Sequence, residues 1–68
     1  MTMTGLLKAK GVKVVKMNIL CGIALIEDEE GEWYYIYKYL EHREELVCVR
    51  AYSERESADA AYIALAER

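Results

Sequence analysis

The hydrophobic and polar positions along the chain predict a run of β-strands followed by one helix. Apolar residues alternate with other positions along 12–26, most clearly from Val15 onward, as expected of a strand with one buried face. Fifteen residues is long for a single strand, and Gly22 within the run is compatible with a bulge, a bend or a division into two strands. Residues 32–40 are mostly aromatic, and 45–52 form the last predicted strand.

Polar segments separate these strands, and a capping motif follows the last of them. The acidic segment 27–31 is typical of a hairpin loop. In turns, an Asp side chain hydrogen-bonds to the nearby backbone, and a glycine such as Gly31 adopts a positive φ without steric cost. Residues 41–44 form a second polar loop. The Ser-x-x-Glu sequence from Ser53 to Glu56 predicts the start of a helix. Apolar residues then recur at helical spacing, at Ala58, Ala61, Tyr62 and Leu65.

The order of these elements predicts an α+β fold. We expect a three-stranded antiparallel β-meander, or four strands if the first run divides, with one C-terminal α-helix packed on one face (β-β-β-α). The predicted single small domain covers 12–68 and follows a flexible basic N-terminal arm over 1–11. A chain of 68 residues buries only about 60% of its unfolded surface, so association with a second copy would add stability.

Loop lengths predict a strand register, and the register divides the strand residues between two faces. We expect Ile26 to lie opposite Trp33, and Tyr39 to lie opposite Leu46. The aliphatic face, on which the helix can pack closely, would hold Ile19, Cys21, Ile23, Leu25, Tyr34, Ile36, Leu40, Val47, Val49 and Ala51. The aromatic face would hold Leu20, Gly22, Ala24, Trp33, Tyr35, Tyr37, Tyr39, Cys48, Arg50 and Tyr52.

The aromatic face is the strongest functional signal in the sequence. One predicted helix cannot cover two faces, and an exposed apolar patch of this size marks an interaction surface, in which Tyr and Trp are enriched. We therefore predict a homodimer joined through this face, with a different protein partner as the alternative. Stacking of nucleic-acid bases on the rings is disfavoured because the flanking loops are acidic. The predicted interface residues are Trp33, Tyr35, Tyr37, Tyr39, Arg50 and Tyr52.

Charge is distributed unevenly, although the net charge is only −3. Residues 1–26 contain four lysines and no acid, and all 12 acids lie in 27–68. The lysines could contact nucleic acid, or they could lie on the acidic surface of the same or a neighbouring chain. The residues of this possible polyanion contact are Lys8, Lys10, Lys13 and Lys16.

The acidic hairpin loop is a candidate contact for a basic partner. An acidic inhibitor of a basic nucleic-acid-processing protein is therefore a further alternative, although a solvated loop is the simpler interpretation. The spacing of the acids is not that of a calcium loop. The residues of this contact are Glu27, Asp28, Glu29 and Glu30.

Residues with catalytic or metal-binding chemistry form no motif. His42 is the only histidine, and Cys21 and Cys48 belong to no C-x-x-C pair, so we expect two reduced, buried thiols in a cytoplasmic protein. We predict no catalytic, cofactor-binding or metal-binding residue, and a non-catalytic protein-binding or regulatory module. The apolar stretch 17–26 is shorter than the roughly 20 residues of a membrane helix, so no membrane association is expected.

Overall fold

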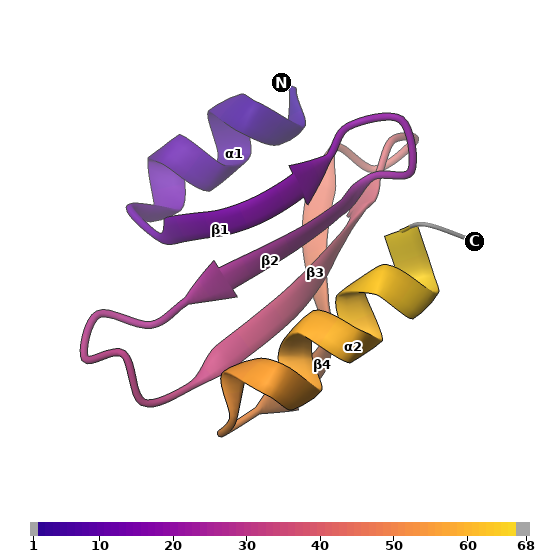
Figure 1. Cartoon of the computed structure of the whole chain (residues 1–68). Coiled ribbons are helices and arrows are strands. Elements are labelled where there is room, and N and C mark those ends of the chain that lie inside the picture. Colours follow the sequence, from indigo (N-terminus) through magenta and orange to yellow (C-terminus); the bar gives the residue numbers. More distant parts are fainter. Residues whose placement is uncertain (1, 67–68) are drawn as a thin grey trace.

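A four-stranded antiparallel sheet lies between two helices in the computed structural model, which describes residues 2–66 (Figure 1). The strands are adjacent in sequence order, β1-β2-β3-β4. The elements are α1 (Met3–Lys10), β1 (Lys13–Asn18), β2 (Ile23–Glu27), β3 (Tyr34–Leu40), β4 (Glu45–Tyr52) and α2 (Arg55–Ala66). The predicted α+β class, the antiparallel meander and the C-terminal helix are confirmed. Residues 67 and 68 of the predicted domain lie outside the described residues.

The long apolar run 12–26 divides into two strands at a turn that ends with Gly22. The Gly22 N–H donates to the Asn18 carbonyl at 2.9 Å, and its own carbonyl accepts from the Tyr39 N–H at 2.7 Å. Gly22 has a φ of +69°, in the left-handed region that glycine adopts without steric cost. Of the three possibilities that the sequence left open, the division into two strands is therefore confirmed.

Helix α1 replaces the flexible arm that the sequence predicts over 1–11, of which residue 1 lies outside the described residues. Its first turn is capped by the Thr2 hydroxyl, which accepts from the Gly5 N–H at 3.1 Å. Its last turn ends at Gly11, whose φ of +69° and N–H bond to the Lys8 carbonyl form a left-handed cap. Gly5, inside this short helix, disfavours helix formation by about 1 kcal/mol relative to alanine. The helix therefore depends on its packing against the sheet more than on its local sequence.

The observed register differs from the predicted one in two ways. Ile26 pairs with Tyr35 rather than with Trp33, a shift of two residues, which leaves the paired side chains of β2 and β3 on their predicted faces. The predicted pair of Tyr39 with Leu46 is confirmed, but a bulge in β4 inserts Val49 between the partners of Tyr37 and Ile36. Beyond this bulge the side chains of β4 exchange faces, so the predicted placement of the end of β4 is wrong.

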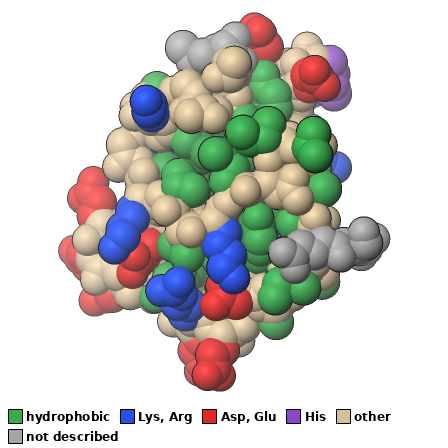
Figure 2. All heavy atoms as spheres, turned by 45° about the horizontal axis from the view of Figure 1, so that its top comes forward, with side chains coloured by type: hydrophobic (Ala, Val, Ile, Leu, Met, Phe, Trp, Pro, Cys, Tyr) green, Lys and Arg blue, Asp and Glu red, His purple; other side chains and the backbone are tan. Residues whose placement is uncertain are grey.

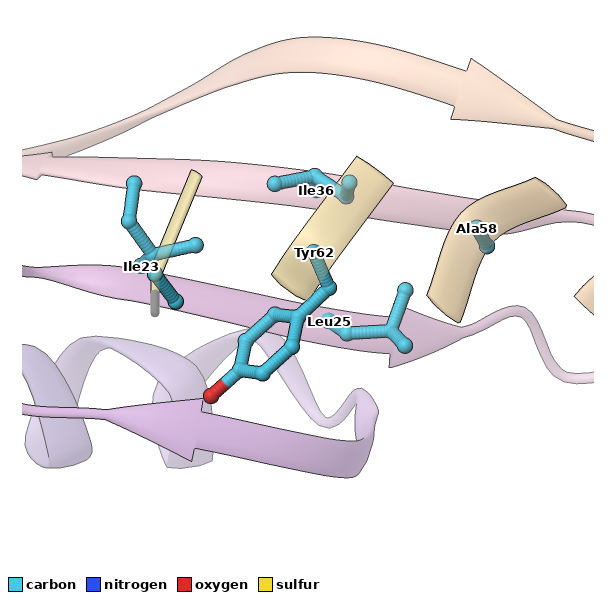
Figure 3. Close-up of a cluster of buried hydrophobic side chains, with 6 residues drawn as sticks. Ile23, Leu25, Ile36, Ala58 and Tyr62 are labelled. Atoms are coloured by element: carbon cyan, nitrogen blue, oxygen red, sulfur yellow. The ribbon is translucent and has the colours of Figure 1, made fainter. Parts of the chain in front are cut away.

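The main hydrophobic core lies between the sheet and α2. Figure 3 shows Ile23 and Leu25 of β2 beside Ile36 of β3, with the ring of Tyr62 lying across β2. Ala58 is fully buried, and its small side chain allows α2 to lie close to the strands. The complete buried cluster is Ile23, Leu25, Ile36, Ala58, Tyr62 and Ala66.

A second cluster lies on the opposite face of the sheet, beneath α1. Met3 and Leu7, one helical turn apart, are both buried against β2. On β2 they meet Ala24 and Ile26, which alternate with the residues of the main core. Both faces of the central strands are therefore covered by a helix.

We expect replacement of Ile36 by Ala to lower the free energy of unfolding by about 2–5 kcal/mol, because Ile36 is fully buried in the main core. The matched change Val47→Ala on exposed β4 should cost about 1 kcal/mol or less. Urea unfolding followed by the fluorescence of the single tryptophan measures both. Equal losses for the two variants would contradict the described core.

Candidate functional site

Helix α1 covers the tyrosines that the sequence predicts to be uncovered. Tyr35, Tyr37 and Tyr39 are half-buried and pack around the cluster beneath α1. Lys10, in the last turn of α1, places its Nζ 5.5 Å from the centre of the Tyr37 ring, within the range of a cation–π contact. Burial raises the pKa of Tyr37 above its ordinary value, and the neighbouring Cys48 and Tyr35 add to the rise. The expectation of an uncovered tyrosine face is therefore wrong.

The remaining predicted interface residues do not join this tyrosine face. Because of the β4 bulge, Arg50 lies opposite Ile36 and Tyr52 opposite Tyr34, on the face that carries α2. Tyr52 packs against the main core. Trp33 precedes β3 and is 45% exposed. The six residues predicted to form one interface are thus divided between two faces and the end of a loop.

The lysines that the sequence suggests for a polyanion are largely engaged by the chain itself. The Lys13 Nζ lies 3.2 Å from Glu27 Oε2, and the Lys16 Nζ lies 3.6 Å from Asp59 Oδ1. On the face shown in Figure 2, Lys and Arg side chains lie next to Asp and Glu side chains. Exposed ion pairs contribute less than about 1 kcal/mol each to the free energy of unfolding. The geometry of these two pairs nevertheless favours the alternative in which the lysines lie on the chain's own acidic surface. Lys8, on α1, has no ion-pair partner in the described part of the chain.

The acidic loop comprises residues 28–33 rather than the predicted 27–31, because Glu27 ends β2 and β3 begins only at Tyr34. It is closed by hydrogen bonds among its own residues and exposes most of its carboxylates. The Asp28 Oδ1 accepts from the Glu32 N–H at 2.8 Å, and the Asp28 N–H donates to the Trp33 carbonyl at 3.0 Å. Gly31 has a φ of +70° and donates to the Asp28 carbonyl. Within this loop, the carboxylates with neither an ion pair nor a hydrogen bond to the described chain belong to Glu29, Glu30 and Glu32.

A groove of about 390 Å³ lies between α2 and β4. Ile23 is buried within its lining, and the exposed Val49 and half-buried Leu65 add apolar surface. Lys38 and Arg50 are exposed and have no ion-pair partner between residues 2 and 66. This α2–β4 groove is lined by Cys21, Ile23, Lys38, Val49, Arg50 and Leu65.

The turn between β1 and β2 forms the end of this groove and is fixed to α2. The Ala66 carbonyl, at the end of α2, accepts from Asn18 Nδ2 at 3.1 Å and from Cys21 Sγ at 3.3 Å. Leu20 at the tip of the turn is 99% exposed. Sequence reasoning placed Leu20 and Cys21 inside a strand and therefore missed this contribution to the surface.

No metal site is assembled among the described residues. They contain no group of three His, Cys, Asp or Glu side chains that could hold a metal ion. His42 is exposed in the turn between β3 and β4. Cys21 and Cys48 are free, as expected, but both are exposed rather than buried, because the turn and the edge strand that carry them are not covered.

Neither described helix is long and apolar enough to cross a membrane. The longer one, α2, has 12 residues, and a span requires about 20. Comparisons with models of protein families, with curated proteins and with solved structures find no match for this chain.

We expect Tyr37→Phe to reduce the loss of stability at alkaline pH. Because the pKa of Tyr37 is raised in the folded state, folding favours the neutral phenol over the phenolate. The resulting contribution to the free energy of unfolding is present at neutral pH and is lost as pH rises above about 10. Urea unfolding of both proteins at pH 8 and pH 10.5 measures the effect. A decline in the variant as large as that in the wild type would contradict the described burial of Tyr37.

Proposed function

We propose that this chain is a small non-catalytic protein-binding module, and that it holds a polypeptide segment in the α2–β4 groove. The observation that carries the proposal is the pairing of an apolar lining with two cations, Lys38 and Arg50, that lack a partner among the described residues. Most of the other cations in the described part of the chain contact an acid or an aromatic ring of the same chain. A groove that retains free cations beside apolar walls is suited to a segment with both acidic and apolar side chains.

The edges of the sheet are poorly suited to binding by strand addition. Both edge strands, β1 and β4, contain a bulge, and both carry charged side chains, including Lys16 and Arg50. Bulges and charges on edge strands oppose pairing with another strand. Recognition by side chains in the groove is therefore better supported than extension of the sheet.

The groove also fits better than the other surfaces considered from the sequence. Helix α1 already packs on the tyrosine face, so a homodimer through that face stays a prediction without support from the packing. A nucleic acid that bound these lysines would have to displace Glu27 from Lys13 and Asp59 from Lys16. The free thiols agree with a reducing compartment, and we include a cytoplasmic location in the proposal.

Selection of random 12-residue peptides on the immobilised protein tests the proposal. We expect the selected peptides to combine acidic with apolar residues and to bind at least about tenfold more weakly to Val49→Asp and to Lys38→Glu. Fluorescence anisotropy of the labelled peptides measures the dissociation constants.

The matched control is Val14→Asp, because Val14 lies on the other edge strand and is 39% exposed, against 45% for Val49. This variant should bind the peptides as the wild type does. If no peptide distinguishes Val49→Asp from Val14→Asp, the α2–β4 groove is not a binding site.

A further inference from the structure

We infer that the segment held in the α2–β4 groove is the acidic loop of a second copy of this chain. This inference rests on the proposed function of the groove and names its partner. The loop supplies free carboxylates beside an exposed tryptophan, and the groove supplies free cations beside apolar walls. The two surfaces are complementary in both charge and polarity.

The carboxylates of the loop divide into those that hold the loop together and those that project from it. The Asp28 carboxylate accepts a hydrogen bond from the Glu32 N–H, and the carboxylate of the preceding Glu27 is paired with Lys13. Glu29 and Glu30 are exposed at the tip and have no ion pair in the described chain. These two can therefore approach cations of another molecule without breaking a contact of their own.

The two cations of the groove are among those that have no acidic partner in the described chain. Besides the lysines of β1, Arg43 is paired with Glu45 at 3.7 Å and Arg55 with Asp59 at 3.8 Å. Lys38 and Arg50 have no such partner among residues 2–66, and both line the α2–β4 groove. A net negative charge of −3 would oppose association of two copies unless acidic and basic regions were brought together.

Trp33 provides an apolar anchor next to these acids. Its carbonyl accepts from the Asp28 N–H, which fixes the backbone at this end of the loop, while 45% of the residue is exposed. Tryptophan is enriched among the residues that dominate binding at protein interfaces. In the groove of a second copy it would contact the apolar side chains of Val49 and Leu65.

The loop and the groove of one copy lie at opposite ends of the sheet. Ile23, in the groove, begins β2, and Glu27, before the loop, ends it, so about 13 Å of strand separates them. Figure 1 shows the loop at the left and the β1–β2 turn at the right, near the end of α2. Two copies in antiparallel orientation bring each loop to the other's groove, and this closes a two-fold dimer with two equal contacts.

A charge-exchange experiment tests the inference. Lys38→Glu/Arg50→Glu reverses the groove, and Glu29→Lys/Glu30→Lys reverses the loop. We expect each variant alone to associate at least about tenfold more weakly than the wild type, because like charges then face each other in both contacts. An equimolar mixture of the two variants should restore association to within about threefold of the wild type, because both contacts again join opposite charges.

Sedimentation equilibrium and the emission wavelength of Trp33 measure association, with a shift to the blue expected as the ring is buried. The control Lys8→Glu/Arg43→Glu changes the net charge as much as the groove variant does, away from the groove, and should associate as the wild type does. Circular dichroism checks that each variant folds. If the groove variant unfolds, Lys38→Gln/Arg50→Gln replaces it, and this variant should also weaken association.

Two results would overturn the inference. One is a wild type that stays monomeric up to about 1 mM, a concentration at which even weak specific contacts are populated. The other is a mixture of the two variants that does not recover association. In either case the selected peptides decide separately on the groove, because their sensitivity to Val49→Asp does not depend on a second copy.

Discussion

The burial of strand β2 on both of its faces is the constraint on which the rest of the structure depends. Ile23 and Leu25 face α2, whereas Ala24 and Ile26 face α1, and all four are buried. A strand buried on both faces needs a cover on each side. Helix α1 therefore completes the fold, although its own sequence favours helix only weakly.

This arrangement leaves the margins of the sheet for recognition. The two helices occupy the central parts of both faces, and the edge strands carry bulges and charges that oppose pairing with another strand. The α2–β4 groove combines apolar walls with charges that have no ion-pair partner in the described chain. The Val49 bulge contributes directly, because it brings Arg50 to the same face as Lys38.

The sequence predicts the elements whose pattern is local. The apolar stripe of α2 is placed correctly from spacing alone, and the acidic hairpin loop and the aromatic strand β3 are placed to within two residues. Helix α1 was missed because it has eight residues, an internal Gly5 and only Met3 and Leu7 as apolar anchors. The continuous apolar run at the start of β2 is the signal that could have indicated a second covering helix, since a half-exposed strand would alternate.

The candidate groove could not be predicted, because it depends on a one-residue insertion. Apolar residues occupy consecutive positions before Val49 (Val47 and Cys48) and again after Arg50 (Ala51 and Tyr52), so the pattern does not show where the strand changes face. Without the bulge Arg50 would lie beside Tyr35, on the tyrosine face. The acidic loop, by contrast, is predicted from sequence to be a contact for a basic partner, and Lys38 and Arg50, which have no ion-pair partner among the described residues, are the cations that we propose for it.

The most direct test is paramagnetic relaxation enhancement between two copies. A nitroxide is attached at Glu30→Cys in a Cys21→Ser/Cys48→Ser background, and this copy is mixed with a ¹⁵N-labelled wild-type chain. If the acidic loop occupies the groove of a second copy, the strongest line broadening will be at the amides of Lys38, Val49 and Arg50 in the labelled copy. Broadening centred on Tyr35 and Tyr37, or no broadening at all, would contradict it.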